Sequence, residues 1–448
     1  MVRHNLSIFN SKIKENIFFY LKITVILIIY LTYFFKEISP QYTQDYMGSL
    51  QDKMDRLENI DEPKIVLVGN SNLAFGMDSE LLECAFGMPV VNTGLHGGLG
   101  SEFSERVVLD NIGRGDIVII CNMYNSDKWG NYFDPLLTWV TLENHWDLYK
   151  LLPKNEYLNF IKGFPAYMKK SINLWLEDNG NIDTGIGCYR RSAFNEYGDI
   201  EVGRMGETYE FTDGSVYDLE ISDKRMESIN QLNDWILKQG GTLLVAGWPL
   251  ALTEEMPDEM QYEELQNKLE EKLQCEIISD ITNYIFDRKY FYDTIYHLND
   301  EGTVIRTLQL IEDLERWSNQ NGNVLKKYEI PAAYCFQNKG FYDEENDGTN
   351  IFRWGRSGAD IILLNTLDVD KKIKLEADVR GINEGTMQML LADDMVSECT
   401  VEQTWKHIEV EFILKPGEND IIILCDAINV TEDIRDLSFS IKNLQIMD

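Results

Sequence analysis

The longest run of apolar positions lies near the N-terminus, over residues 17–35, where Lys22 is the only charged side chain. About 20 residues are enough for a helix to cross the apolar core of a bilayer, and Lys22 lies near one end, where its ammonium group can reach the headgroups. The run is apolar on every side, which favours a membrane span over the alternative, a buried core helix. No small-residue cleavage site follows, so we expect a signal anchor rather than a removed signal peptide.

The charges on either side of this run predict its orientation. Basic residues precede the span and Glu37 follows it, a distribution that is typical of a cytoplasmic N-terminus. Residues 1–40 are therefore predicted to form a cytoplasmic tail and one membrane anchor, with everything after residue 40 outside the cytoplasm. The next segment, residues 38–60, is polar and rich in acidic residues, and we expect a stalk or a leading helix there.

Short apolar, β-branched runs then alternate with segments of helical periodicity. This alternation predicts a parallel sheet with helices on both faces, within a domain that spans residues 41–327. The expected strands cover residues 64–68, 89–92, 116–121, 242–246 and 275–279, and the expected helices cover residues 78–86, 101–112, 225–239, 260–273 and 301–317.

The periodicity blurs over residues 125–224, a stretch that is rich in tryptophan and tyrosine. A long irregular insertion after a strand end is typical of a lid or a substrate-binding wall. Aromatic rings stack on sugars, but they also fill cores, and the sequence leaves both roles open for each tryptophan.

From residue 328 to residue 448 the pattern changes to short alternating runs separated by turn residues. Evenly spaced short strands indicate a β-sandwich of roughly a hundred residues. The expected strands cover residues 359–364, 372–377, 408–414, 420–425 and 437–442.

Composition narrows the function classes. The chain of 448 residues carries a net charge of −34, which argues against nucleic-acid binding because phosphate contacts need clustered Lys and Arg. The seven cysteines are scattered without a Cys-x-x-Cys pair, so neither a zinc site nor a dense disulfide framework is indicated. We expect no metal and no organic cofactor.

The chemistry-bearing residues follow the predicted strands. Ser71 comes directly after the strand at 64–68, on a turn at the carboxyl end, where open α/β sheets bind their ligands. The alternative for this stretch is an ordinary loop in which Ser71 caps a helix. The strand at 89–92 runs into a glycine-rich turn with Asn92, His96 and Gly97, and Asp293 and His297 stand four residues apart just before the last helix.

The strand-end serine, the glycine loop and the late Asp-x-x-x-His-Leu-Asn together resemble the SGNH (GDSL-like) hydrolase superfamily over residues 60–318. The resemblance is closest to its membrane-anchored members that work on cell-envelope polysaccharides. It implies a flavodoxin-like, three-layer α/β fold. The segments 340–344, 351–354 and 415–420 resemble accessory jelly-roll modules of bacterial polysaccharide enzymes; the alternative is a sandwich that only packs on the catalytic domain.

A serine hydroxyl needs a base to become a nucleophile, and His297 is the best candidate. Of the other histidines, His4 precedes the span, His407 lies in the sandwich and His145 has no acid at motif spacing. Asp293 is the acid expected to orient the imidazole. The family more often spaces this pair three apart, so Asp293 either contacts the ring or only shapes the loop.

The resemblance also implies an oxyanion hole made of the Ser71 and Gly97 N–H groups and an asparagine amide. The usual Gly-x-Asn-Asp is replaced here, and either Asn122 or Asn125 is the candidate donor. The side chains expected to face the substrate are Asn70, Asn72, Asn92, His96, Tyr124 and Trp248, although a structural turn is an equally good explanation for Trp248.

These patterns predict a serine-dependent hydrolase or O-acyltransferase that removes or transfers a small acyl group, such as acetyl, on a cell-surface polysaccharide. Hydrolysis and transfer would use the same residues. The expected partners are the acylated glycan, the bilayer and, as a candidate, a multi-span membrane acyltransferase. The alternative is a non-catalytic protein of the same fold that binds glycan or assists envelope assembly.

Overall fold

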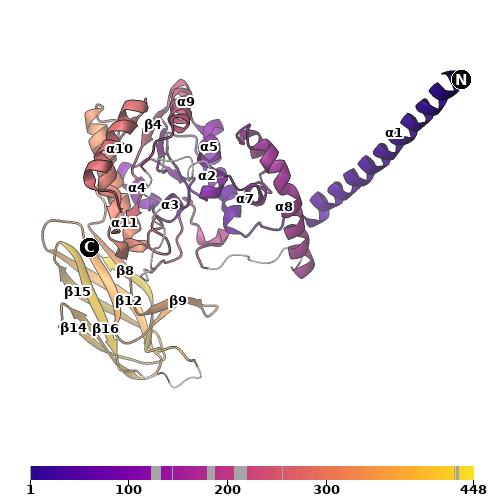
Figure 1. Ribbon diagram of the computed structural model, residues 1–448. Coiled ribbons are helices and arrows are strands. Elements are labelled where there is room, and N and C mark those ends of the chain that lie inside the picture. Colours follow the sequence, from indigo (N-terminus) through magenta and orange to yellow (C-terminus); the bar gives the residue numbers. More distant parts are fainter. Residues whose placement is uncertain are drawn as a thin grey trace.

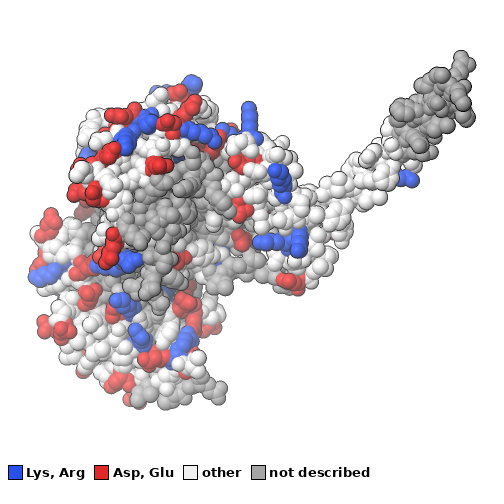
Figure 2. Space-filling view, in the orientation of Figure 1, with Lys and Arg blue, Asp and Glu red and all other residues white. Residues whose placement is uncertain are grey.

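The computed structural model describes residues 2–122, 133–143, 145–178, 187–205, 219–254, 256–427, 429 and 433–447, with the side chains before residue 16 left out. A long N-terminal helix projects from an α/β body, and a β-sandwich lies on the other side of that body (Figure 1). Acidic and basic side chains are interspersed over the visible face of both domains, as expected for a solvated acidic exterior (Figure 2).

The projecting helix is α1 (Val2–Tyr33), which continues into one turn of π-helix, η1 (Phe34–Ile38). The segment Asn16–Ile38 has a mean hydropathy of 2.1, and only 6% of its most apolar stretch is buried. This low burial argues against a core helix. The segment has the length and composition of a membrane span or a signal sequence.

The α/β body is built on five parallel strands in the order β2-β1-β3-β4-β6. This is the strand order of flavodoxin-like sheets, in which the order reverses between β1 and β3 and ligands bind at the carboxyl ends beside that point. All five predicted strands are present, although the last is shorter than expected. They are β1 (Ile65–Val68), β2 (Val90–Asn92), β3 (Ile117–Ile120), β4 (Thr242–Val245) and β6 (Glu276–Ile277).

Alternate residues of each strand pack into two separate hydrophobic cores, one on each face of the sheet. The body therefore has three layers. In β1, Val66 and Val68 pack with one set of helices, whereas Ile65 and Leu67 pack with the other. The first layer holds α2 (Leu50–Asn59), α5 (Ser101–Arg106), α9 (Asp223–Gln239) and α10 (Glu259–Lys272), and the second holds α4 (Ser79–Phe86) and α11 (Asp300–Gln320).

Two helical predictions need correction. The helix expected over 101–112 ends at Arg106, and only a 3-10 turn, η4 (Leu109–Asn111), follows. The insertion is more regular than expected, because it contains α7 (Pro135–Leu142) and the 22-residue α8 (Tyr157–Asp178). Gly163 and Pro165 lie inside α8, and because such residues usually mark a break in a helix, no helix was predicted there.

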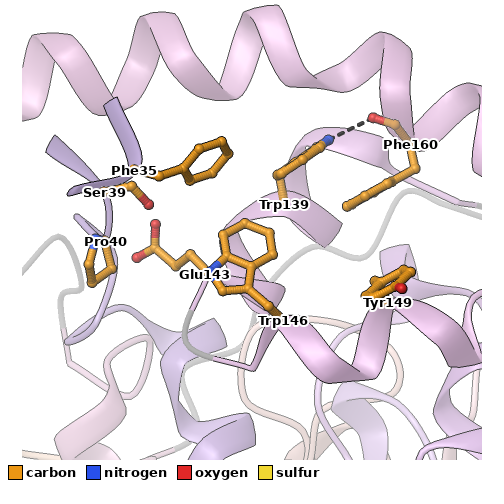
Figure 3. Close-up of a pocket in the computed structure, with 8 residues that line it drawn as sticks. All are labelled: Phe35, Ser39, Pro40, Trp139, Glu143, Trp146, Tyr149 and Phe160. Atoms are coloured by element: carbon orange, nitrogen blue, oxygen red, sulfur yellow. Dashed lines mark hydrogen bonds between the residues drawn. The ribbon is translucent and has the colours of Figure 1, made fainter. Parts of the chain in front are cut away.

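The chain between α1 and the body is fixed by Glu143, which follows α7. Its carboxylate accepts hydrogen bonds from the backbone N–H of Gln41 (3.0 Å) and of Tyr42 and from the Tyr167 hydroxyl of α8 (2.8 Å). The Tyr167 hydroxyl also lies 2.7 Å from that of Ser39. Figure 3 shows the Glu143 carboxylate facing Ser39 at the end of η1. Burial raises the pKa of Glu143 to about 7, against the opposing effect of these hydrogen bonds.

We expect Glu143→Gln to flatten the pH dependence of stability. A carboxyl group whose pKa is raised on folding stabilises the fold below its unfolded pKa, and that contribution is lost as pH rises through about 7. For Glu143 the loss between pH 5 and pH 8 amounts to about 3 kcal/mol. Urea unfolding of the full chain at both pH values measures it, with Glu177→Gln on the exposed end of α8 as the control. An unchanged pH dependence in Glu143→Gln would contradict the assignment.

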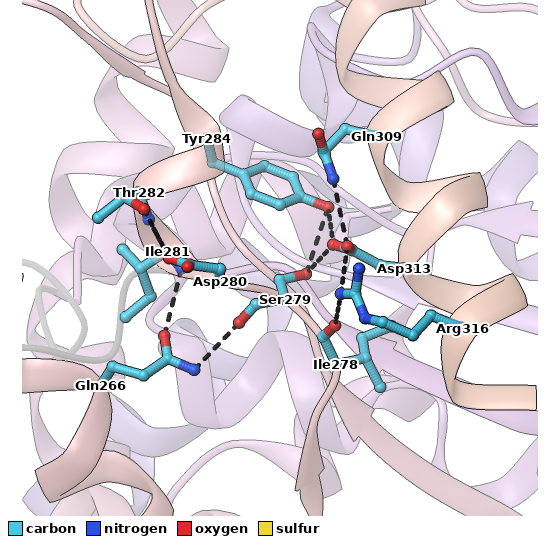
Figure 4. A network of polar contacts seen from close by, with 10 residues as sticks. All are labelled: Gln266, Ile278, Ser279, Asp280, Ile281, Thr282, Tyr284, Gln309, Asp313 and Arg316. Atoms are coloured by element: carbon cyan, nitrogen blue, oxygen red, sulfur yellow. Dashed lines mark hydrogen bonds and ion pairs between the residues drawn. The ribbon is translucent and has the colours of Figure 1, made fainter. Parts of the chain in front are cut away.

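A buried polar network holds α11 against the end of the sheet (Figure 4). The Asp313 carboxylate accepts hydrogen bonds from the hydroxyls of Ser279 (2.5 Å) and Tyr284 (2.8 Å) and from the Arg316 guanidinium (2.7 Å). Arg316 also donates to the Ile278 carbonyl. Because these contacts lie in the C-terminal half of α11, they set the direction in which its N-terminus points, which is toward the candidate site.

The C-terminal domain is a sandwich of two five-stranded antiparallel sheets, in the orders β15-β12-β17-β10-β9 and β14-β13-β16-β11-β8. The five predicted strands are all present, and five more, with weaker alternation, were not predicted. The strands are β8 (Ala333–Gln337), β9 (Phe341–Asn346), β10 (Ile351–Gly355), β11 (Ala359–Asn365), β12 (Lys371–Gly381), β13 (Gly385–Leu391), β14 (Asp394–Val401), β15 (Lys406–Leu414), β16 (Gly417–Cys425) and β17 (Phe439–Met447).

The sandwich packs directly on the α/β body. Phe336, Ile362 and Leu364 on the outer face of β8 and β11 belong to the same buried cluster as α4 and α11. Glu418 pairs with Lys289 and accepts a hydrogen bond from the Tyr290 hydroxyl. The packing role expected as one alternative for the sandwich is therefore present in the structure.

Candidate active site

Ser71 lies just beyond the carboxyl end of strand β1, as predicted. It is the first residue of a four-residue helix, α3 (Ser71–Ala74), that precedes the helix expected from residue 78. The Asn70 side chain caps α3 by accepting a hydrogen bond from the Asn72 N–H at 3.1 Å. Ser71 is half-buried, and as the first helical residue its N–H has no partner within α3.

His297 and Asp293 contact each other in the loop before α11. The His297 Nδ1 lies 2.7 Å from a carboxylate oxygen of Asp293. The loop closes through a hydrogen bond from the Tyr292 N–H to the His297 carbonyl (2.8 Å) and another from the His297 N–H to the Thr294 hydroxyl (2.9 Å). This closed turn shows why the four-residue spacing still brings the carboxylate onto the ring.

The segment that carries Ser71 and the loop that carries His297 are held together by Phe75. Its ring stacks on the His297 imidazole with 4.1 Å between ring centroids and 5° between the planes. Phe75 follows α3, and its N–H donates to the Ser71 carbonyl at 2.9 Å. The imidazole therefore lies against the helical turn that Ser71 begins.

Side chains of α11 also hold the turn that Ser71 begins. Arg306 is fully buried and donates to the carbonyls of Asn72 (2.7 Å) and Gly76 (3.1 Å). Thr303 donates to the Phe75 carbonyl at 3.0 Å. Carbonyl groups at the end of α3 thus find donors on α11, which makes the position of Ser71 depend on the helix that follows His297.

Phe75→Ala is expected to lower the free energy of unfolding by about 3–5 kcal/mol, because it empties a fully buried aromatic site. The loss removes the ring that supports His297, so the loop 293–297 should also become less protected in hydrogen exchange. Chemical denaturation measures the first effect. The control is Leu252→Ala at a position that is 55% exposed, where a change within about 0.5 kcal/mol is expected; an equally small change at Phe75 would refute the packing argument.

The electrostatics of the pair favour a neutral imidazole that can accept a proton. Burial lowers the pKa of His297, whereas the hydrogen bond and charge of Asp293 raise it and Arg204 lowers it. Burial also acts to raise the pKa of Asp293, but the hydrogen bonds from His297 and Tyr189 outweigh it and the net shift is downward. With Nδ1 donating to Asp293, Nε2 carries the free lone pair. Nε2 is buried and makes no hydrogen bond within the described part of the chain.

Tyr189 is a site residue that the sequence did not reveal. Its hydroxyl donates to the second carboxylate oxygen of Asp293 and lies 3.5 Å from the His297 Nδ1. Tyr189 comes from the insertion, far from any of the three motifs, so no spacing pointed to it. Asp293 is thereby held from two sides.

Two asparagines supply amide groups that have no partner in the fold. The side chains of Asn72 in α3 and Asn122 after β3 are each 1% exposed, and neither their Nδ2 nor their Oδ1 atoms make a hydrogen bond among the described residues. Because β3 is the neighbour of β1, Asn122 lies at the switch point beside the Ser71 turn. The other candidate donor, Asn125, and the predicted substrate contact Tyr124 lie outside the described residues.

His96 and Gly97 lie in the loop after β2. The His96 Nδ1 accepts a hydrogen bond from the Gly98 N–H at 2.9 Å, which leaves Nε2 to carry the proton in the neutral ring. Partial burial and then the electrostatic effect of His297 lower the pKa of His96. Gly97 lies beside Asn70, whose Nδ2 would be 3.8 Å from a Cβ at position 97. The glycine loop and Asn70 are therefore neighbours at this edge of the sheet.

Two of the residues predicted to contact substrate are instead buried and make their contacts within the fold. The Asn92 amide is fully buried and bonds to the Leu73 carbonyl, to Asp199 and to the Gly94 N–H. Trp248 is 1% exposed and belongs to the core. The sequence left two interpretations open for Trp248, and its burial fits the structural turn. The contacts of Asn92 give no support for a ligand-facing role.

Comparison with known proteins leaves the family open. No family model and no curated protein matches the sequence. Among solved structures, a family 35 carbohydrate-binding module from an environmental isolate is similar at 14% identity and a TM-score of 0.19, over 26% of this chain and 93% of that one. A module from the Cellvibrio mixtus lichenase 5A gives 14% identity and a TM-score of 0.18, over 25% and 88%.

A family two carbohydrate esterase from Clostridium thermocellum, solved with cellohexaose, is similar at 10% identity and a TM-score of 0.16, over 26% of this chain and 33% of that one. At these TM-scores the likenesses carry no weight for function, which has to be argued from the residues of this chain. The resemblance to SGNH hydrolases accordingly stays a prediction.

Proposed function

We propose that this protein is a membrane-anchored serine esterase or O-acyltransferase that acts on an acylated polysaccharide outside the cytoplasm. The observation that carries the proposal is the Asp293–His297 pair. The buried imidazole stacks on Phe75, at the end of the turn that begins with Ser71, and its Nε2 stays without a partner in the described fold. A buried polar atom without a partner needs an explanation, and a catalytic role is one of those that explain it.

In the first half of the reaction, the Ser71 hydroxyl oxygen attacks the carbonyl carbon of the ester, and His297 Nε2 takes the hydroxyl proton. Asp293 keeps the Nδ1 proton in place and stabilises the imidazolium that forms. The negative oxygen of the tetrahedral intermediate would be held by the N–H groups of Ser71 and Gly97 and by the Asn122 amide. Collapse of the intermediate breaks the ester bond, and His297 returns the proton to the departing sugar hydroxyl.

In the second half, a hydroxyl attacks the acyl–Ser71 ester, with His297 again acting as the base. Water gives a free acid and makes the protein an esterase. A hydroxyl of another sugar gives a new ester and makes it an O-acyltransferase. His96, with its proton on Nε2, would serve as a donor to the substrate at the rim of the site.

The test uses the purified full chain in detergent, with p-nitrophenyl acetate as the substrate and a serine-directed fluorophosphonate as the label. We expect slow ester hydrolysis and one phosphonate adduct, which peptide mass spectrometry maps to Ser71. Neither turnover nor adduct would favour the non-catalytic alternative, a glycan-binding or assembly protein that keeps the fold. An adduct on another serine would also overturn the proposal.

A further inference from the structure

The α8 helix (Tyr157–Asp178) has an apolar stripe on its outer face that the fold does not use. Leu158, Ile161 and Leu176 are 61%, 63% and 69% exposed. At 100° per residue they lie within about 60° of one another around the helix, on the side away from Phe160 and Tyr167, which are buried. Leu158 and Ile161 are one turn apart, and Leu176 lies about 22 Å further along the same side of the helix. Exposed large apolar side chains on one side of a helix are a candidate interaction surface.

The charge of α8 is opposite to that of the whole chain. Over Tyr157–Asp178 there are three lysines (Lys162, Lys169 and Lys170) and two acidic residues, Glu177 and Asp178 at the C-terminal end, so the helix has a net charge of +1 in a chain whose net charge is −34. All three lysines are exposed, and Figure 2 shows basic side chains near the place where the long helix leaves the body. A helix with apolar residues flanked by lysines on one face is typical of a helix that lies on an anionic membrane surface.

The end of α1 packs on the inner face of the same helix. The Phe34 ring lies 5.8 Å from the rings of both Phe164 and Tyr167, and the Phe35 ring stacks on Phe164 at 5.7 Å. In Figure 1, α8 crosses the base of α1 rather than running along it. If α1 spans a bilayer, α8 therefore lies at the membrane surface where α1 emerges.

An aromatic hollow of about 510 Å³ lies beside this contact, between the end of α1, α7, α8 and the 3-10 segment η5 (Trp146–Leu151). Figure 3 shows that aromatic rings from all of these elements surround it. They are Phe35, Trp139, Trp146, Tyr149 and Phe160. Tryptophan and tyrosine are the side chains that membrane proteins place at headgroup level.

We propose that α8 and this hollow form a second membrane contact, in which α8 lies in the headgroup region of an anionic bilayer with Leu158 and Ile161 inserted. The inference rests on the membrane anchoring in the proposed function, but not on the ester chemistry. It explains why the insertion carries apolar side chains on both faces of one helix: one face packs on the body, and the other contacts lipid.

The experiment places the photo-crosslinking residue p-benzoylphenylalanine at position 158 or 161 of the full chain, reconstituted in nanodiscs of phosphatidylcholine with phosphatidylglycerol. The controls carry it at Leu237 of α9 and Ile413 of β15, which are 56% and 60% exposed. Irradiation followed by mass spectrometry should give lipid adducts at 158 and 161 in at least tenfold higher yield than at the controls. Equal yields, or adducts at 158 and 161 with another polypeptide, would overturn the proposal.

Resistance to carbonate extraction is measured first for each variant. If the chain is extracted, α1 is not an anchor and the contact proposed for α8 falls with it. Fluorophosphonate labelling of Ser71 is independent of this result, so failure of the membrane contact can be told apart from failure of the ester chemistry.

Discussion

Ser71→Ala should lower kcat/KM for p-nitrophenyl acetate by about 10⁴-fold or more, because the variant has no atom that can form the acyl-enzyme. Fluorophosphonate labelling should disappear in the same variant. Its stability should change little, since the Ser71 side chain is half-buried at the start of a four-residue helix that Asn70 caps. Loss of turnover without loss of folding is the signature of a nucleophile rather than of a structural serine.

The matched control is Ser171→Ala. Ser171 is also a helical serine, and its hydroxyl donates to the Tyr167 carbonyl at 3.0 Å within α8, away from β1 and α3. Ser171→Ala should keep the wild-type kcat/KM. The two variants should therefore differ in kcat/KM by the whole loss expected for Ser71→Ala. Equal hydrolysis by wild type and Ser71→Ala would mean that the slow reaction arises elsewhere on the surface, and the enzyme proposal would fail.

The sequence predicted two kinds of element, strands that are buried on both faces and helices that carry one apolar face. The strands β1, β3 and β4 are buried on both sides and read as continuous apolar runs. Helices such as α9 and α11 carry one apolar face and were found within a few residues. The α8 helix was missed for another reason: Gly163 and Pro165 lie inside it, and such residues usually mark a break in a helix.

Local sequence placed Asp293 and His297 four residues apart in one loop and left open whether the carboxylate contacts the ring; the structure shows that it does. Local sequence did not predict Tyr189, Phe75 or Arg306, which fix this pair and the Ser71 turn. These residues come to the site from three different segments through tertiary packing. The residues next to them in the sequence give no sign of these contacts. Asn92 is the opposite case: its motif position suggested substrate, whereas its hydrogen bonds are made within the fold.

Asp293→Asn is expected to lower kcat/KM by about 10³–10⁴-fold, because an amide in place of the carboxylate favours the wrong imidazole tautomer and cannot stabilise the imidazolium. Tyr189→Phe is the matched control. It removes one hydrogen bond to the same carboxylate and leaves the carboxylate in place, so we expect a loss within about tenfold. A loss at Asp293→Asn as small as that of Tyr189→Phe would mean that Asp293 only shapes the loop.

The pH profile separates these roles further. The base must be neutral to accept the serine proton, so activity falls as pH drops through the His297 pKa, which burial holds below its usual value of 6.5 against the opposing effect of Asp293. Removing the carboxylate takes away the effects that raise this pKa, and the acid limb of kcat/KM should therefore move to lower pH in Asp293→Asn. In Tyr189→Phe the carboxylate stays and loses a donor, which makes it a stronger acceptor for His297, so the limb should stay in place or move to higher pH. A limb that moves to lower pH in Asp293→Asn but not in Tyr189→Phe would follow from an acid that acts on the imidazole, whereas a loop residue would lower activity at every pH alike.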